Sequence, residues 1–148
     1  MNKVNYKSTI TACSTNTWRT FISNVQNSST YPRMTYNTEM IGNLALLDAF
    51  HKLKDDWDGN DAPGFCDKAA LIKFCKEVII NLGYQQPNIY PTSRGSIQLE
   101  YEKDNGEYLE FEIFEEERII GFQICSNQEE INVEIRSIEE LKKKVMAF

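Results

Sequence analysis

The stretch IQLEYEKDNGEYLEFEI, residues 97–113, decides the fold. Apolar and polar side chains alternate at both of its ends, which is the pattern of a strand with one buried face. Between them, Asp104-Asn105-Gly106 suits a three-residue hairpin loop with glycine in the left-handed conformation. The spacing predicts an antiparallel hairpin whose apolar residues share one face, namely Ile97, Leu99 and Tyr101 with Leu109, Phe111 and Ile113.

Two further alternating stretches follow and extend the hairpin to a four-stranded antiparallel meander. Their apolar positions are Ile120, Phe122 and Ile124, then Ile131, Val133 and Ile135. Continuing the register predicts two rows on the polar face. One row holds Glu100, Glu110, Gln123 and Asn132, and the adjacent row holds Gln98, Glu112, Gly121 and Glu134.

Two helical patterns precede the strands, over residues 39–56 and 66–82, and the sequence WDGNDAP joins them at residues 57–63. Gly59 can take the positive φ that ends a helix, and Pro63 biases the residue before it away from the α region. We therefore expect a structural turn made by Trp57, Asp58, Gly59 and Pro63, with the tryptophan as a core plug at the helix end.

These elements predict the fold class. A sheet that is apolar on one face needs a single covering layer, and the two long helical patterns are sized to provide it. Ser137-Ile138-Glu139-Glu140 is a capping box that opens a C-terminal helix. We predict a two-layer α+β fold in which helices cover one face of a four-stranded antiparallel meander.

The 148 residues fit one ordinary domain. Residues 1–38 are rich in Ser, Thr and Asn, which predicts a polar arm. One segment of the arm has helical spacing and predicts a short docked helix, with Trp18, Phe21, Ile22 and Val25 on one side. Residues 39–148 then form a single α+β domain.

The net charge of −6 is divided unevenly along the chain. Lys3, Lys7, Arg19 and Arg33 precede the first acidic residue, Glu39, so the arm carries +4 and the remainder −10. An acidic body disfavours nucleic acid, whose affinity comes mostly from neutralised phosphates, although contact of the arm with phosphates stays open. No stretch has the character of a signal peptide or a membrane span. We expect a cytosolic protein that does not bind membranes.

Cys13, Cys66, Cys75 and Cys125 show no C-x-x-C spacing, and His51 is the only histidine. A zinc site needs more imidazole or paired thiolates than this set supplies. We expect reduced thiols, no metal ion and no other cofactor.

The polar face of the sheet is the candidate binding site, with Glu100, Glu110, Glu112, Glu134 and Gln123 as its residues. Like charges opposite one another on neighbouring strands are mildly destabilising, so this face lowers the stability of the fold slightly. Three interpretations remain: a solvated face, a docking face for a basic partner, and a carboxylate catalytic or divalent-metal site. No nucleophile, base or phosphate-binding motif stands out, so no catalytic residue is predicted.

The middle of the chain resembles a family pattern. The residues that carry the resemblance are Trp57-Asp58-Gly59 with Ala62 and Pro63, then an amphipathic helix, Pro87 and Pro91, and finally GSIQLEY at residues 95–101. The family comprises small uncharacterised bacterial and phage-borne proteins that often carry W-[DN]-G-x-x-A-x-P, then P-x-x-x-P and G-x-I-x-L-E-[WY]. The resemblance covers roughly residues 40–125 and includes Glu100. This chain departs from it at Asn60, where an aromatic residue is common, and at Tyr101, where tryptophan is usual. The resemblance implies no activity.

We hypothesise a small acidic interaction protein of the accessory, antitoxin or immunity type, which binds a basic protein through its polar sheet face. The alternative is a carboxylate-dependent enzyme or a divalent-metal-binding protein that uses the same face.

Overall fold

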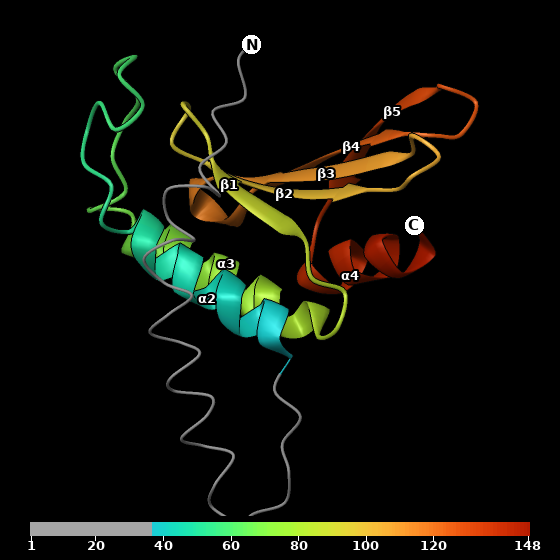
Figure 1. Ribbon diagram of the computed structural model, residues 1–148, viewed down its shortest axis with the longest axis horizontal. Helices are drawn as coiled ribbons and strands as arrows, with labels where there is room; N and C mark the ends of the chain where they lie inside the picture. The colour runs from blue at the N-terminus through green and yellow to red at the C-terminus, as the bar shows by residue number, and fades with distance from the viewer. Residues whose placement is uncertain (1–36) are drawn as a thin grey trace, which may run out of the picture. The chain divides into compact units, whose positions relative to one another are not determined.

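The computed structural model describes residues 37–148. The predicted arm, except for residues 37 and 38, and the short helix predicted within it lie outside the described residues. Figure 1 shows an α+β arrangement with one antiparallel sheet in the order β1-β2-β3-β4-β5. The elements are α2 Thr38–Phe50, α3 Ala69–Leu82, β1 Asn88–Pro91, β2 Ile97–Glu102, β3 Tyr108–Ile113, η1 Glu115–Glu117, β4 Ile119–Ile124, β5 Glu130–Ile135 and α4 Ile138–Ala147. No helix among residues 37–148 is long and apolar enough to cross a membrane.

The sheet has five strands where four were predicted, because β1 was missed. β1 is four residues long, and it pairs with β2 from Asn88 opposite Glu100 to Pro91 opposite Ile97. So short a strand shows little alternation, and its proline is typical of a loop. A proline is nevertheless tolerated in an edge strand, where one side of the backbone needs no partner.

The β2–β3 hairpin has the predicted register. Glu100 lies opposite Glu110, and Gln98 lies opposite Glu112. Gly106 has φ +84°, and its N–H bonds to the carbonyl of Lys103. The predicted three-residue loop with a left-handed glycine is therefore confirmed.

The predicted register of β4 is wrong by one residue. Phe122, not Gln123, lies opposite Glu110, and Ile120, not Gly121, lies opposite Glu112. A one-residue shift moves every side chain of a strand to the other face. Both alternations along β4 contain isoleucine, because Ile119 and Ile120 are adjacent, so the apolar pattern alone could not choose between them.

Packing around Gly121 explains why β4 adopts the observed register and not the predicted one. A Cβ at this position would lie 3.1 Å from Cβ of Val133 and 3.3 Å from Cδ1 of Phe111. Glycine leaves room for these two side chains on the buried face. The apolar positions of β5 face the side that was predicted, since Val133 lies opposite Gly121.

We call the buried side of the sheet the inner face. Its two central rows are Ile89, Leu99, Phe111, Gly121 and Val133, and Pro91, Ile97, Ile113, Ile119 and Ile135. All of these residues are buried. Figure 1 shows α2, α3 and α4 on one side of the sheet.

The helices are shorter than predicted. α2 ends at Phe50 rather than near Asp56, and α3 begins at Ala69 rather than near Cys66. Helical spacing continues through Leu53 in the sequence, but the Leu53 carbonyl accepts the N–H of Phe65 at 2.8 Å across the loop. The same carbonyl also accepts the Cys66 thiol, so it is bonded across the loop and not along a helix.

The intervening loop, residues 51–68, contains the predicted turn. Asp58 Oδ1 accepts the N–H of Asn60 at 2.9 Å, and Gly59 has φ +73°. Trp57 Nε1 donates to the Pro63 carbonyl at 3.1 Å. Trp57 itself is half-buried, and the core plug of this region is the fully buried Phe65, whose ring centroid lies 6.3 Å from that of the tryptophan.

The predicted N-cap of the last helix is confirmed, but the glutamate of the predicted capping box bonds to the residue before the N-cap. Ser137 Oγ accepts the N–H of Glu140 at 3.1 Å, and Glu140 in turn accepts the N–H of Arg136 at 2.9 Å. Cys75 is a buried free thiol on α3, whereas Cys66 is exposed.

Gly64 offers a direct test of the loop packing. An added Cβ would lie 2.8 Å from backbone atoms of Leu53, Lys54 and Asp55, so Gly64→Ala should lower the free energy of unfolding by about 1–3 kcal/mol. Gly42→Ala is the matched control, because nothing lies within 4 Å of its added Cβ, and alanine should stabilise α2 by about 0.5–1 kcal/mol. Urea unfolding of both variants measures the difference, and equal stabilities would contradict the packing described for this loop.

Candidate functional site

We call the side of the sheet opposite the inner face the outer face. Its rows are Asn88, Glu100, Glu110, Phe122 and Asn132; Tyr90, Gln98, Glu112, Ile120 and Glu134; and Glu102, Tyr108, Ile124 and Glu130. Carboxylates dominate β2, β3 and β5, while β4 contributes only apolar side chains.

Two facing carboxylates are held by shared donors at the centre of this face. Gln98 Nε2 donates to Glu100 Oε1 at 2.7 Å and to Glu110 Oε2 at 2.6 Å. The Tyr108 hydroxyl lies 2.8 Å and 2.5 Å from the same two oxygens. Because the hydroxyl has one proton and the amide has two, these two side chains can satisfy both carboxylates together. The like charges therefore lie side by side in a fixed hydrogen-bonded cluster.

Tyr108 joins this cluster to the apolar part of the face. Its ring packs edge-on against Phe122, with centroids 6.5 Å apart. Burial, followed by the hydrogen bonds to Glu110 and Glu100, raises the pKa of the Tyr108 phenol above its ordinary value of 10.0. The phenol therefore stays protonated and remains a donor at neutral pH.

Glu112 lies in the next row and is a structural residue. Only 7% of it is exposed, and it accepts hydrogen bonds from the Ser96 hydroxyl and from the Arg94 guanidinium. Ser96 is fully buried and lies 2.6 Å from the Thr92 hydroxyl. These contacts tie the β1–β2 loop to β3, so Glu112 stabilises the sheet instead of offering a free acceptor.

The other two predicted site residues lie apart from this cluster. Glu134 is on the outer face but is separated from Glu112 by Ile120, and it forms an exposed ion pair of 3.1 Å with Arg136. Gln123 lies on the opposite side of the sheet, between Leu109 and Ile131. Of the predicted set, the structure thus brings together Glu100 and Glu110, with Glu112 in the neighbouring row.

The apolar residues of β4 are the part of this face that the sequence prediction missed. Ile120 is 43% exposed, and Phe122 and Ile124 are half-buried. They form a stripe between the carboxylates of β3 and those of β5. The adjacent isoleucines at the start of β4 were the one signal that both faces of this strand carry apolar side chains.

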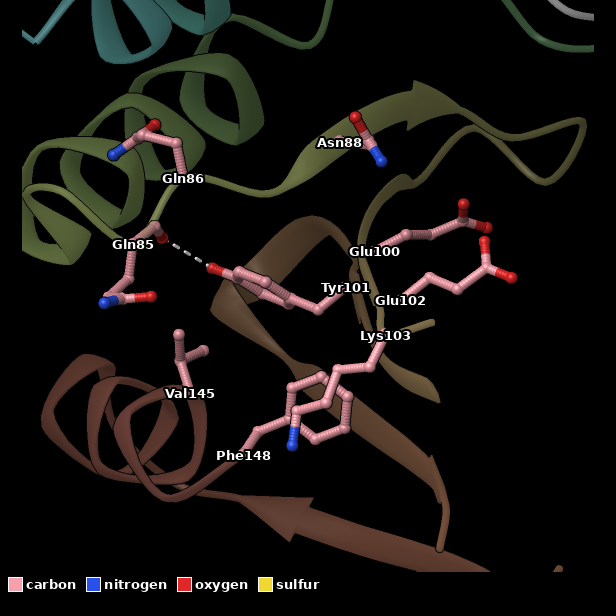
Figure 2. A pocket seen from close by; sticks show the side chains of 9 residues that line it. All are labelled: Gln85, Gln86, Asn88, Glu100, Tyr101, Glu102, Lys103, Val145 and Phe148. Carbon is pink, nitrogen blue, oxygen red and sulfur yellow. Dashed lines mark hydrogen bonds between the residues drawn. The ribbon is translucent and has the colours of Figure 1, made fainter. Parts of the chain in front are cut away.

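A cleft of about 310 Å³ opens where β1 begins, beside the part of β2 that continues past it (Figure 2). It is lined by Gln85, Gln86, Asn88, Glu100, Tyr101, Glu102, Lys103, Val145 and Phe148. The Tyr101 hydroxyl donates to the Gln85 carbonyl at 2.8 Å, and Lys103 Nζ lies 4.2 Å from the centroid of the Phe148 ring. In Figure 2 the side chains of Glu100 and Glu102 point away from this aromatic side, so the cleft combines an apolar wall with an acidic rim.

Within residues 37–148, no group of three or more His, Cys, Asp or Glu side chains is placed to hold a metal ion. The facing pair Glu100 and Glu110 could supply carboxylate oxygens, although Gln98 and Tyr108 already donate to one oxygen of each.

Comparisons with protein-family models, with curated proteins and with solved structures found no match. The resemblance to the small bacterial and phage-borne proteins therefore stays a prediction. In this chain Pro63 follows Ala62 directly, one position earlier than in the A-x-P spacing of that pattern.

The raised pKa of Tyr108 predicts a fall in stability at alkaline pH. A group whose pKa is higher in the folded than in the unfolded protein stabilises the fold below its unfolded value, and this stabilisation is lost as the pH rises above it. The free energy of unfolding should thus decline above about pH 10, and Tyr108→Phe should make the decline shallower. The variant retains part of the decline, because burial also raises the pKa of Tyr101 and of Cys75.

Urea unfolding between pH 7 and pH 11 measures this effect. At pH 7 the variant should be less stable by about 1 kcal/mol, because Glu100 and Glu110 lose a shared donor. A decline identical to that of the unaltered protein would show that Tyr108 ionises as readily in the folded state as in the unfolded state.

Proposed function

We propose that this protein is a small interaction module that binds a basic protein partner through the outer face of its sheet. The observation that carries the proposal is the apolar stripe of Ile120, Phe122 and Ile124 on β4, which lies between the acidic side chains of β3 and those of β5. Exposed apolar patches with a polar rim are typical of protein interaction sites.

The charge of this face supports a basic partner. Glu100, Glu102, Glu110, Glu130 and Glu134 contribute negative charge, and the body from Glu39 onward carries −10. Complementary charge speeds encounter and selects among partners more than it adds affinity. The apolar stripe would then supply the area that is removed from water on binding.

The cluster around Tyr108 supports binding in a second way. Gln98 and Tyr108 hold the carboxylates of Glu100 and Glu110 in place, so little side-chain freedom remains to be lost on association. Acceptors that are already ordered reduce the entropic cost of binding.

We infer that the helical layer covers the inner face and leaves the outer face to the partner. A cytosolic accessory, antitoxin or immunity-like role fits such a module, in which binding alone is the function. The resemblance of residues 40–125 to small bacterial and phage-borne proteins is in keeping with this class.

A titration with the partner tests the proposal. The partner is recovered with the tagged full-length chain at low salt, identified by mass spectrometry, and purified for the measurement. Glu110→Lys should weaken binding about tenfold or more at low salt, and the loss should shrink as salt screens the charge. Ile120→Ala should weaken binding to a similar extent at every salt concentration, because it removes apolar contact.

Glu77→Lys is the matched control, since it makes the same charge change at an exposed position on α3. Its affinity should equal that of the unaltered protein apart from a small effect of net charge. Equal affinities for all three variants would exclude the outer face as the binding surface.

The facing carboxylates Glu100 and Glu110 are the observation that favours the alternative, a carboxylate enzyme or divalent-ion site. Under the interaction proposal, Mg²⁺, Mn²⁺ and Ca²⁺ should leave the Tm unchanged, because an ion that bridges Glu100 Oε1 and Glu110 Oε2 would have to displace Gln98 and Tyr108. An ion present at about a hundred times its Kd would instead stabilise the fold by about 2.7 kcal/mol. A Tm increase with one ion, abolished by Glu110→Gln, would favour the alternative.

A further inference from the structure

The free edge of β5 has a second kind of binding capacity. β5 is the last strand in the sheet order, and no strand among residues 37–148 pairs with the edge of β5 that faces away from β4. It is six residues long, and four of its residues, including Glu130, Asn132 and Glu134, are exposed. An exposed edge of this length is a template for another strand.

The hydrogen-bond ladder shows which backbone groups this edge offers. The N–H of Cys125 bonds to the carbonyl of Glu129, which fixes the first bonded pair between β4 and β5. Bonded pairs alternate along an antiparallel ladder, so Ile131, Val133 and Ile135 direct their backbone groups toward β4. The N–H and C=O groups of Glu130, Asn132 and Glu134 therefore point away from the sheet.

The other edge of the sheet is protected, and the contrast is informative. β1 is only four residues long, and it ends in Pro91, which has no N–H to donate. Asn43 of α2 donates to the Pro87 carbonyl at 3.0 Å, just before β1 begins, so a helix is anchored beside this edge. Short length and proline are two of the devices that block strand addition. Among residues 37–148, β5 has neither, and the charges of Glu130 and Glu134 act only against a like-charged strand.

We propose that β5 accepts an extended, basic segment of the partner as a sixth strand. This inference rests on the proposed function, because it identifies how the same basic partner engages the chain. Backbone groups of Glu130, Asn132 and Glu134 would pair with the segment. Lysine or arginine side chains of the segment would lie beside the carboxylates of Glu130 and Glu134 on the outer face, next to the apolar stripe.

Charge argues against a second copy of this chain as the occupant. Antiparallel pairing of two β5 strands about Asn132 would place Glu130 of each copy opposite Glu134 of the other. Like charges directly opposite are destabilising, whereas opposite charges stabilise a pair of strands. The two glutamates thus disfavour self-association while they favour a basic strand.

Amide hydrogen exchange of the full-length, ¹⁵N-labelled protein tests this proposal. Without ligand, the amides of Glu130, Asn132 and Glu134 should exchange about tenfold faster or more than those of Ile131, Val133 and Ile135. The probe is an acetylated and amidated heptapeptide in which lysine alternates with valine. It should slow exchange at Glu130, Asn132 and Glu134 by about tenfold or more, while the matched peptide with glutamate for lysine should not.

A pair of variants separates backbone pairing from side-chain contact. Asn132→Pro removes the outward N–H, and Asn132→Thr retains it with a side chain suited to a strand. The proline variant should lose about tenfold or more in affinity for the lysine peptide, and the threonine variant should retain its affinity. If the proline variant does not fold, the exchange measurement decides alone.

Three results would overturn the proposal. Chemical-shift changes confined to Tyr108 and Phe122, with unchanged exchange along β5, would leave the outer face as the site and exclude the edge. Protection of the same amides by dimerisation without peptide would assign the edge to a second copy. Absence of binding by the lysine peptide would exclude addition of a basic strand. The partner titration with Glu110→Lys and Ile120→Ala would still decide the proposed function separately.

Discussion

The sheet depends on one constraint, the equal length of its four hairpin loops. The hydrogen-bonded residues that close the loops are Thr92 and Ser96, Lys103 and Glu107, Phe114 and Arg118, and Cys125 and Glu129. Each loop therefore has three residues, and the loops recur every 11 residues along the chain. Loop length sets register, and register sets the face of every side chain. One additional residue in any loop would move every side chain of the following strands from the inner face to the outer face, or the reverse.

This register creates the acidic cluster and the apolar stripe of the proposed surface. It places Glu100 opposite Glu110, within reach of Gln98 and Tyr108, and it turns the apolar side chains of Ile120 and Phe122 outward beside them. The same alternation directs the backbone groups of Glu130, Asn132 and Glu134, which pair with no strand among residues 37–148, away from the sheet. The acidic cluster, the apolar stripe and the open edge are thus consequences of a single repeating geometry.

Sequence reasoning succeeded where the turn chemistry was visible. Gly106 identified the β2–β3 loop, and through it the pairing of Glu100 with Glu110. It failed at β4, because the preceding loop places Glu116 and Glu117 at positive φ without any glycine to reveal the turn. It also extended α2 past Phe50, since nothing in the local sequence shows that the Leu53 carbonyl bonds to a residue 12 positions later. Long-range hydrogen bonds and glycine-free turns leave no periodic signal.

The charge arrangement of the outer face favours the proposed binding surface over a merely solvated face. Opposite charges in facing positions stabilise a sheet by roughly 0.2–1 kcal/mol per pair, so a face selected for stability alone would alternate acids and bases across strands. Here Glu100 faces Glu110, and Arg94 and Arg136 lie beyond the ends of the strands, in contact with Glu112 and Glu134. Gln98 and Tyr108 offset the repulsion without neutralising the charge. The centre of the face therefore combines acidic side chains with satisfying donors, which is the arrangement that the proposed recognition of a basic partner would use.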